Sequence, residues 1–273
     1  MSPGNGAPPE PARPAAEPAP VQEGDLPELV RRIRERTPAR LWAGRAGTSY
    51  RTGTQIGLRQ AHAEARDAVR DELDLARDLG ASLLERWQLF EVSTEAANKD
   101  QYLLRPDLGR RFGGPSRSEV TGRCPANADL QIAIGDGLSV TAVRRQVPEL
   151  LPLLLDGAKQ RAWSVGQPFV VRHCRVGVLN EIGGLLRPKV AVLLIGERPG
   201  LATAESLSAY MAYEPRENHS DRDRNLISNI HARGVHTREA AERILDLAAQ
   251  MMRRRNSGYT LREAPLGSNW IAT

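Results

Sequence analysis

One stretch decides the fold: Val190-Ala-Val-Leu-Leu-Ile195, followed directly by Gly196-Glu-Arg-Pro-Gly200. The six consecutive apolar residues predict a strand that is buried on both faces of a sheet. The glycine-rich, charged turn then lies at the carboxyl end of this strand. Because open α/β sheets bind ligands at that edge, this turn is the first candidate for a functional site.

Apolar runs and helical patterns alternate on both sides of this strand. The expected strands are 130–134, 169–171 and 190–195, and the expected helices are 141–155, 179–186 and a closing helix with Thr237 as its N-cap. Such alternation is typical of a mostly parallel sheet flanked by helices. We therefore predict a Rossmann-like α/β domain over residues 124–273.

Two further parts precede this domain. Residues 1–24 are mostly Pro, Ala, Gly and Glu with a single Val, so they bury too little apolar surface to fold, and we expect a disordered tail. Residues 25–123 follow a helical pattern, which predicts a small helical subdomain. The pattern places apolar side chains at helix spacing in two stretches: Leu26, Leu29, Val30 and Ile33 before Pro38, then Ala65, Val69, Leu73 and Ala76 on one face.

Composition narrows the class of protein. The chain has 273 residues and a net charge of +5, but its positive residues are interleaved with Asp and Glu, and aromatic residues make up only 4%. This pattern is typical of a mixed charged surface and does not favour nucleic-acid binding. No apolar run approaches a membrane span and no signal segment is present, so we expect a soluble, cytosolic protein. Cys124 and Cys174 are expected to be ordinary thiols, and the five histidines show no metal-binding spacing.

Three polar segments are candidate sites, and each also has a purely structural interpretation. The segment 44–52 combines paired glycines, hydroxyls and two arginines, but a tight loop with exposed arginines is the simpler explanation. The turn Gly135-Asp-Gly-Leu-Ser139 is glycine-rich, yet it fits no nucleotide-binding motif. Glu197 and Arg198 can act on a ligand or form a local ion pair at the strand end. No catalytic constellation is recognisable.

Several separate motifs nevertheless occur in the order found in one family. They are Gly44-Arg-Ala-Gly47, Lys99-Asp-Gln-Tyr-Leu-Leu-Arg-Pro-Asp-Leu-Gly-Arg-Arg111, Gly135-Asp-Gly-Leu-Ser139, Gly196-Glu-Arg-Pro-Gly200, Glu205-Ser-Leu-Ser208 and Ile227-Ser-Asn-Ile-His231. From Leu26 to Met252 the chain thereby resembles the small (light) subunit of ethanolamine ammonia-lyase.

The resemblance implies a function that composition and spacing do not reveal. That family converts ethanolamine into acetaldehyde and ammonia with adenosylcobalamin. This chain would clamp the cofactor, through its α/β domain, against a separate large subunit that holds the substrate, within a higher-order hetero-oligomer. By position in the motifs, the cobalamin contacts carry over to Val176, Glu197 and Leu226, and no catalytic or metal-ligating residue is expected here. Leu226 replaces the cysteine familiar in enterobacterial members, which indicates a backbone or packing contact.

The resemblance also raises questions of ligation and location. The Asp-x-His-x-x-Gly motif, by which some cobalamin proteins supply a histidine to cobalt, is absent, so the cofactor is expected to keep its own base (base-on). Family members are often packaged in bacterial microcompartments, but the Pro-rich start cannot form an amphipathic targeting helix, so a cytoplasmic complex is the other expectation. The alternative function is a stand-alone, non-catalytic α/β nucleotide-binding module with its phosphate-facing turn at Gly135 to Ser139.

Overall fold

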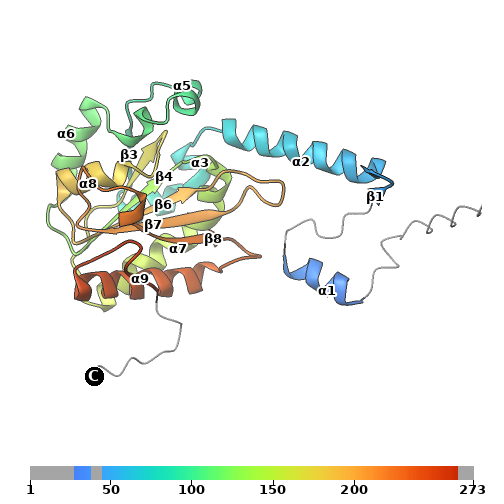
Figure 1. Ribbon diagram of the computed structural model, residues 1–273. Coiled ribbons are helices and arrows are strands. Elements are labelled where there is room, and N and C mark those ends of the chain that lie inside the picture. Colours follow the sequence, from blue (N-terminus) through green and yellow to red (C-terminus); the bar gives the residue numbers. More distant parts are fainter. Residues whose placement is uncertain (1–27, 38–44, 264–273) are drawn as a thin grey trace, which may run out of the picture.

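The computed structural model describes residues 28–37 and 45–263 and has the expected α/β fold, with one large sheet between two layers of helices (Figure 1). The tail predicted for residues 1–24 lies outside the described residues, as does Gly44. The helices are α1 (Glu28–Arg36), α2 (Thr52–Arg70), α3 (Leu75–Leu79), α4 (Ala81–Trp87), α5 (Lys99–Leu104), α6 (Gly114–Arg123), α7 (Val140–Gln160), α8 (Val178–Leu186) and α9 (Thr237–Arg254). Two 3₁₀ turns span Leu108–Arg110 and Asp221–Asp223.

The large sheet has six strands in the order β3-β5-β4-β6-β7-β8. Its strands are β3 (Phe90–Ser93), β4 (Leu130–Gly135), β5 (Phe169–Arg172), β6 (Val190–Gly196), β7 (Leu207–Tyr213) and β8 (Asn225–Ile230). β3, β5, β4 and β6 pair in parallel, while β7 and β8 are added antiparallel at the β6 side. The chain passes from β4 to β5 on one side and then to β6 on the other, which creates the switch point where such sheets bind ligands.

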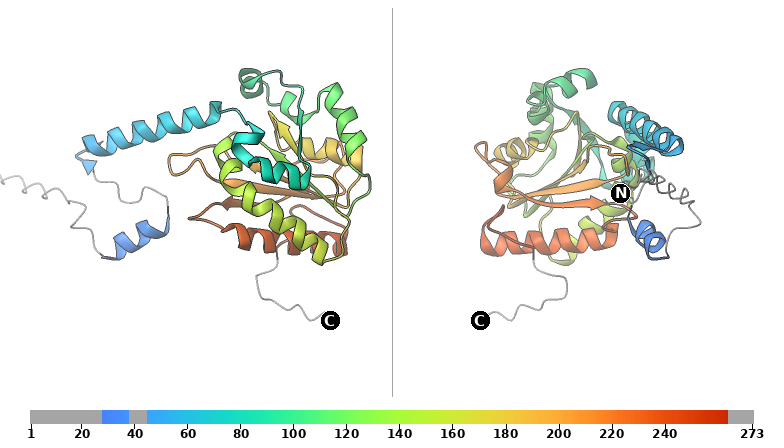
Figure 2. Two further views of the ribbon diagram at one scale, coloured as in Figure 1. Left: turned by 180° about the vertical axis from the view of Figure 1, so that it is seen from behind. Right: turned by 45° about the vertical axis from the view of Figure 1, so that its right-hand side comes forward.

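Helices cover both faces of this sheet, as the continuous apolar strands require (Figure 2). Alternate residues of β6 belong to different cores: Val192 and Leu194 pack with α3, α4, α7 and α9, and Leu193 packs with α6 and α8 on the opposite face. Every residue of β4 and β6 is buried. The prediction of a mostly parallel sheet flanked by helices is therefore confirmed.

The N-terminal segments differ from the sequence expectation. The helical pattern from Ala65 to Ala76 predicted one helix, but α2 ends at Arg70 because Asp71 has an extended backbone (ψ 143°). Leu73 consequently leaves the helix and is buried in the main core. Residues 25–123 also contribute strand β3, whose four residues alternate between buried and half-buried but are too few to mark a strand in the sequence. The sheet therefore includes residues on both sides of residue 124. The domain boundary itself stays a prediction.

Smaller expectations have mixed outcomes. The segment 45–50 forms an exposed hairpin of β1 (Arg45–Ala46) and β2 (Ser49–Tyr50) that turns at Gly47 (φ +59°). Thr237 is not the N-cap of α9 but its first residue, because His236 still has the extended backbone of a cap. Both cysteines are free and buried. Among the helices that the structure describes, none is long and apolar enough to cross a membrane.

Candidate functional site

A cavity of about 330 Å³ lies at the carboxyl edge of the parallel strands, at the switch point. The turns that follow β4, β5 and β6 form one side, and β7 and β8 form the other. Val176, Glu197 and Leu226 all line this cavity, although they lie on three different segments of the chain. The structure thus brings the three predicted contact residues together; what they contact stays a prediction.

Glu197 is held firmly by one of its two carboxylate oxygens. Its Oε1 accepts hydrogen bonds from the Ser208 hydroxyl at 2.6 Å and from the Asn229 backbone amide at 2.9 Å. A register shift in the pairing of β7 with β8 and the positive φ of Asn229 (62°) take that amide out of the regular ladder. Among the described residues, no hydrogen bond reaches Oε2. Glu197 therefore offers a fixed, available acceptor at the cavity.

The alternative interpretation of Glu197 as one half of a local ion pair does not fit this geometry. Within the described part of the chain, no Lys, Arg or His nitrogen lies within 4.0 Å of its carboxylate. Arg198 is exposed on the neighbouring position and lines the same cavity. The carboxylate is thus positioned by neutral donors from β7 and β8, which leaves its negative charge uncompensated.

Val176 and Leu226 supply apolar surface to the same cavity. Val176 is half-buried in the turn between β5 and α8. Leu226 lies on β8 opposite Tyr210 of β7, and 45% of its surface is exposed. An aliphatic side chain that is this exposed on a sheet does not belong to the core. It is available to contact another molecule.

The two glycine-rich turns at this edge pack against each other. A Cβ on Gly137 would lie 2.3 Å from the Gly196 carbonyl oxygen, and a Cβ on Gly196 would lie 2.0 Å from the Ser139 carbonyl oxygen. Leu138 also donates its amide to the Gly196 carbonyl at 3.1 Å. The close approach of the two backbones therefore explains these glycines, and no pattern in the sequence indicates that the two turns meet.

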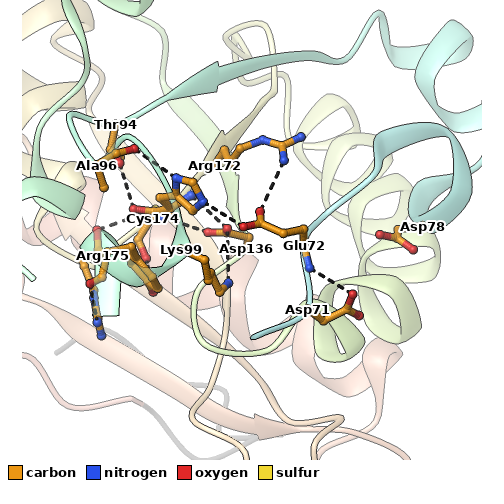
Figure 3. Close-up of polar contacts among 12 residues, drawn as sticks. Asp71, Glu72, Asp78, Thr94, Ala96, Lys99, Asp136, Arg172, Cys174 and Arg175 are labelled. Atoms are coloured by element: carbon orange, nitrogen blue, oxygen red, sulfur yellow. Dashed lines mark hydrogen bonds and ion pairs between the residues drawn. The ribbon is translucent and has the colours of Figure 1, made fainter. Parts of the chain in front are cut away.

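A buried carboxylate, Asp136, fastens the turn after β5, whose residues Cys174 to Val176 line the cavity (Figure 3). Asp136 is fully buried just after β4, and its two oxygens accept hydrogen bonds from the backbone amides of His173 (2.9 Å) and Cys174 (2.8 Å). Burial raises the pKa of Asp136, against the opposing effects of Lys99 and of the two amides. Lys99 places its Nζ 3.8 Å from Oδ2. Asp136 thereby fixes the turn that carries Arg175 and Val176.

Tyr102 joins the same network from α5. Its ring is fully buried, and its hydroxyl donates to the Cys174 carbonyl at 3.0 Å. The guanidinium carbon of Arg175 lies 4.2 Å from the ring centroid, and the Lys99 Nζ lies 5.2 Å from it. Both α5 residues occur in the long motif that begins at Lys99, but no periodicity in the sequence indicates that they meet Asp136.

Both ring nitrogens of His173 are engaged within the protein. The imidazole is 4% exposed, its Nδ1 lies 3.1 Å from the Ala96 carbonyl oxygen, and its Nε2 lies 3.4 Å from Oε1 of Glu72. In residues 28–37 and 45–263, no group of three or more His, Cys, Asp or Glu side chains is arranged to hold a metal ion.

A comparison with known protein families identifies the family to which this sheet and cavity belong. The model of the family described as "Ethanolamine ammonia-lyase light chain" matches residues 27–262, which include the sheet and the whole cavity. The chain belongs to the ethanolamine ammonia-lyase light chain family. It is therefore a lyase subunit, as the motif order predicted.

Curated members of this family resemble the chain over most of its length. The "Ethanolamine ammonia-lyase small subunit" of Clostridium acetobutylicum is 38% identical over 242 residues, which are 89% of this chain and 96% of the relative. The proteins of the same name from Clostridium perfringens and Fusobacterium nucleatum are each 38% identical, over 86% and 85% of this chain and 78% and 76% of their own lengths.

Proposed function

We propose that this chain is the cofactor-clamping subunit of an adenosylcobalamin-dependent ammonia-lyase. In this proposal a separate large subunit binds ethanolamine and performs its conversion to acetaldehyde and ammonia, and the two subunit types form a higher-order complex. The observation that carries the proposal is the shared cavity of Val176, Glu197 and Leu226 at the switch point of the sheet. The names of the relatives support the reaction, and the cavity supports the task of this subunit.

The residues at the cavity fit a cobalamin. The corrin ring has an apolar edge and a fringe of amide groups, so it requires exposed apolar surface beside hydrogen-bond acceptors. Leu226 and Val176 provide the first, and the available Oε2 of Glu197 provides the second. When bound, the cofactor supplies the radical that starts the reaction. The residues of this chain bind and orient it, and they limit the access of water.

The arrangement also favours a base-on cofactor. His173 is the histidine nearest in sequence to Val176, but its ring is buried, and the Ala96 carbonyl and Glu72 carboxylate occupy its two nitrogens. A histidine ligand to cobalt would have to give up these partners. His173 would therefore leave the coordination of cobalt to the base of the cofactor itself.

A stand-alone nucleotide-binding module is less well supported. Its phosphate-facing turn would be Gly135 to Ser139, but Gly137 packs against Gly196 and the Ser139 hydroxyl donates to the Ala204 carbonyl. The buried carboxylate of Asp136 in the same turn would repel a phosphate. The turn thus serves packing within the fold.

Reconstitution with the large subunit tests the proposal. The purified chain, the purified large subunit and their complex are each incubated with ethanolamine and adenosylcobalamin, and ammonia release is measured. We expect turnover only in the complex, together with retention of the cobalamin absorbance after gel filtration. Turnover by this chain alone, or an active complex that needs no corrinoid, would refute the proposal.

A further inference from the structure

A second and larger cavity, of about 880 Å³, adjoins the first. The two share Arg175, Val176 and Tyr210. The larger cavity is lined by five arginines, namely Arg110, Arg111, Arg117, Arg175 and Arg224. It also has three carboxylates, namely Glu181, Glu217 and Asp221. The wall is therefore positively charged, and no part of the function described so far uses this charge.

Only two of these arginines are neutralised by the carboxylates of the wall. Arg117 pairs with Glu181 at 2.5 Å, and Arg224 pairs with Asp221. Among the described residues, no carboxylate oxygen lies within 4.0 Å of a guanidinium nitrogen of Arg110, Arg111 or Arg175. Unpaired arginines that gather around one cavity repel one another, and an anion between them relieves this repulsion.

Two glycines place two of the unpaired arginines. A Cβ on Gly177 would lie 2.7 Å from Cγ of Arg110, and a Cβ on Gly109 would lie 2.6 Å from Cγ of Arg175. Each glycine thus makes room for the arginine of the opposite loop, and the Arg175 amide donates to the Gly109 carbonyl at 2.8 Å. The two loops interlock so that both arginines line the same cavity. Random surface arginines would not need such a fitted arrangement.

Arg224 provides the buried part of the site. Its side chain is only 5% exposed, and it donates from Nη2 to Oδ1 of Asn180 at 2.8 Å. Its Nε is buried and has no acceptor among the described residues, and the same holds for the Nε of Arg175. Burial lowers the pKa of Arg224, against the opposing effect of Asp221, and the positive charge of Arg110 also lowers it. The wall therefore carries more guanidinium groups than carboxylates, and an anionic ligand would compensate this excess of positive charge.

We propose that this second cavity binds an anion of the phosphate class, held by Arg110, Arg175 and Arg224. Guanidinium groups match phosphate oxygens in a forked geometry, and three of them suit a tetrahedral anion better than a planar carboxylate. The phosphate has two chemical sources, inorganic phosphate or the phosphodiester of a nucleotide tail on the cofactor in the adjoining cavity. The second source rests on the proposed function.

Inorganic phosphate tests the site without the cofactor. The full-length chain is titrated with phosphate by calorimetry at low salt, alongside three variants. Arg110→Gln removes a charge, and Gly177→Ala keeps every charge but displaces the Arg110 side chain. Arg253→Gln removes an exposed charge on α9, which covers the opposite face of the sheet. We expect the first two to weaken phosphate binding about tenfold or more, and the control to leave it unchanged.

A second experiment, with corrinoids, shows which of the two sources supplies the phosphate. The complex with the large subunit is titrated with adenosylcobalamin and with adenosylcobinamide, which lacks the phosphate and the nucleotide. If the tail supplies the phosphate, Arg110→Gln weakens adenosylcobalamin about tenfold and leaves adenosylcobinamide unchanged. Phosphate binding in the first arm with no such difference in the second assigns the site to inorganic phosphate.

The outcomes separate this proposal from the proposed function. A complex that binds neither corrinoid contradicts the cofactor role but leaves the phosphate titration as an independent result. Equal behaviour of Arg110→Gln, Gly177→Ala and the control in both arms, at unchanged thermal stability, overturns the anion site. Because Arg110 is exposed, its substitution should not prevent folding.

Discussion

At the scale of single residues, the site depends on the different roles of the two carboxylate oxygens of Glu197. Oε1 of Glu197 is committed to Ser208 and Asn229, so the side chain cannot rotate freely, and Oε2 is left for a ligand. One oxygen therefore positions the side chain, and the other is available to bind a ligand. A glutamine at the same position keeps an acceptor for the internal bonds but loses the negative charge.

The substitution Glu197→Gln is therefore expected to weaken cobalamin binding without unfolding the protein. The loss of a charge-assisted acceptor should cost roughly 1 to 3 kcal/mol in the affinity of the assembled complex for adenosylcobalamin. Equilibrium dialysis measures this difference. Glu119→Gln on α6, where the carboxylate is exposed and pairs with Arg123, is the matched control. An unchanged dissociation constant for Glu197→Gln would remove Glu197 from the cofactor site.

A second prediction at this scale concerns the ligand below cobalt. With both His173 nitrogens engaged in the protein, cobalamin labelled with nitrogen-15 in its own base should give an isotope-dependent coupling in the cobalt(II) electron-paramagnetic spectrum. The coupling should be present in the complexes of both the parent and His173→Ala. A coupling insensitive to the label in the parent, and lost only in His173→Ala, would instead identify a protein ligand.

At the scale of elements, a buried ion cluster fastens the short α3 to α7. Asp78 of α3 has a fully buried side chain, and it accepts hydrogen bonds from Nε of Arg77 (2.7 Å) and from Nε of Arg144 on α7 (2.7 Å). Its Oδ2 also accepts from the Asp74 amide at 2.9 Å. Burial raises the pKa of Asp78, but these hydrogen bonds outweigh burial and lower the pKa to about 2.

This cluster predicts a pH-dependent stability. Asp78→Asn should lower the free energy of unfolding by about 1.5 to 3 kcal/mol at neutral pH, because it removes the charge that both arginines share. The folded pKa lies below the unfolded value, so the stabilising effect is present above about pH 4 and disappears as the pH falls toward 2. Urea unfolding of both proteins at several pH values tests this. A difference that is constant over that range would show that Asp78 does not act through its charge.

The elements that the sequence predicted correctly are those with a single dominant signal. β6 is a continuous apolar run, β4 is apolar except for Gln131, and α7, α8 and α9 have clear apolar stripes. β7 carries buried Met211 beside half-buried Tyr210, and β8 alternates weakly, so neither shows the apolar run that marks a parallel strand. β7 is defined by its antiparallel pairing with β6, and β8 by its antiparallel pairing with β7, and no local pattern encodes either contact.

The residues of the candidate site also differ in how far the sequence predicts them. The position of Glu197 after a buried strand could be derived from physics, whereas Val176 and Leu226 were found only through family motifs, since lone aliphatics usually belong to the core. Asp136, Lys99 and Tyr102 all belong to recognisable motifs, but the network that joins them could not be predicted, because the two motifs are distant in the sequence and meet only through tertiary packing. The periodicity of a sequence shows which residues share a face of one helix or strand. It does not show which distant segments come into contact in the folded protein.

At the scale of the whole molecule, the folded body is the sheet with its two cores, and α2 lies largely outside it. α2 has one buried residue, Ala61, and it runs outward from the sheet in Figures 1 and 2. α1 has no buried residue. Leu73, just beyond α2, is 1% exposed and packs in the core with α7 and α9. The boundary of the cooperative unit should therefore fall near residue 71.

Removal of residues 1–70 tests this boundary against a single core substitution. The shortened chain loses one buried alanine, some half-buried aliphatic surface and the exposed Arg70 to Asp100 pair, so its unfolding free energy should fall by no more than about 2 kcal/mol. In the full chain, Leu73→Ala creates a cavity in the main core and should cost about 2 to 5 kcal/mol. Both proteins should unfold in one cooperative transition in urea, followed by circular dichroism. If the shortened chain is the less stable of the two, or unfolds without cooperativity, then α2 belongs to the cooperative core despite its exposure, and the body of the protein begins before residue 71.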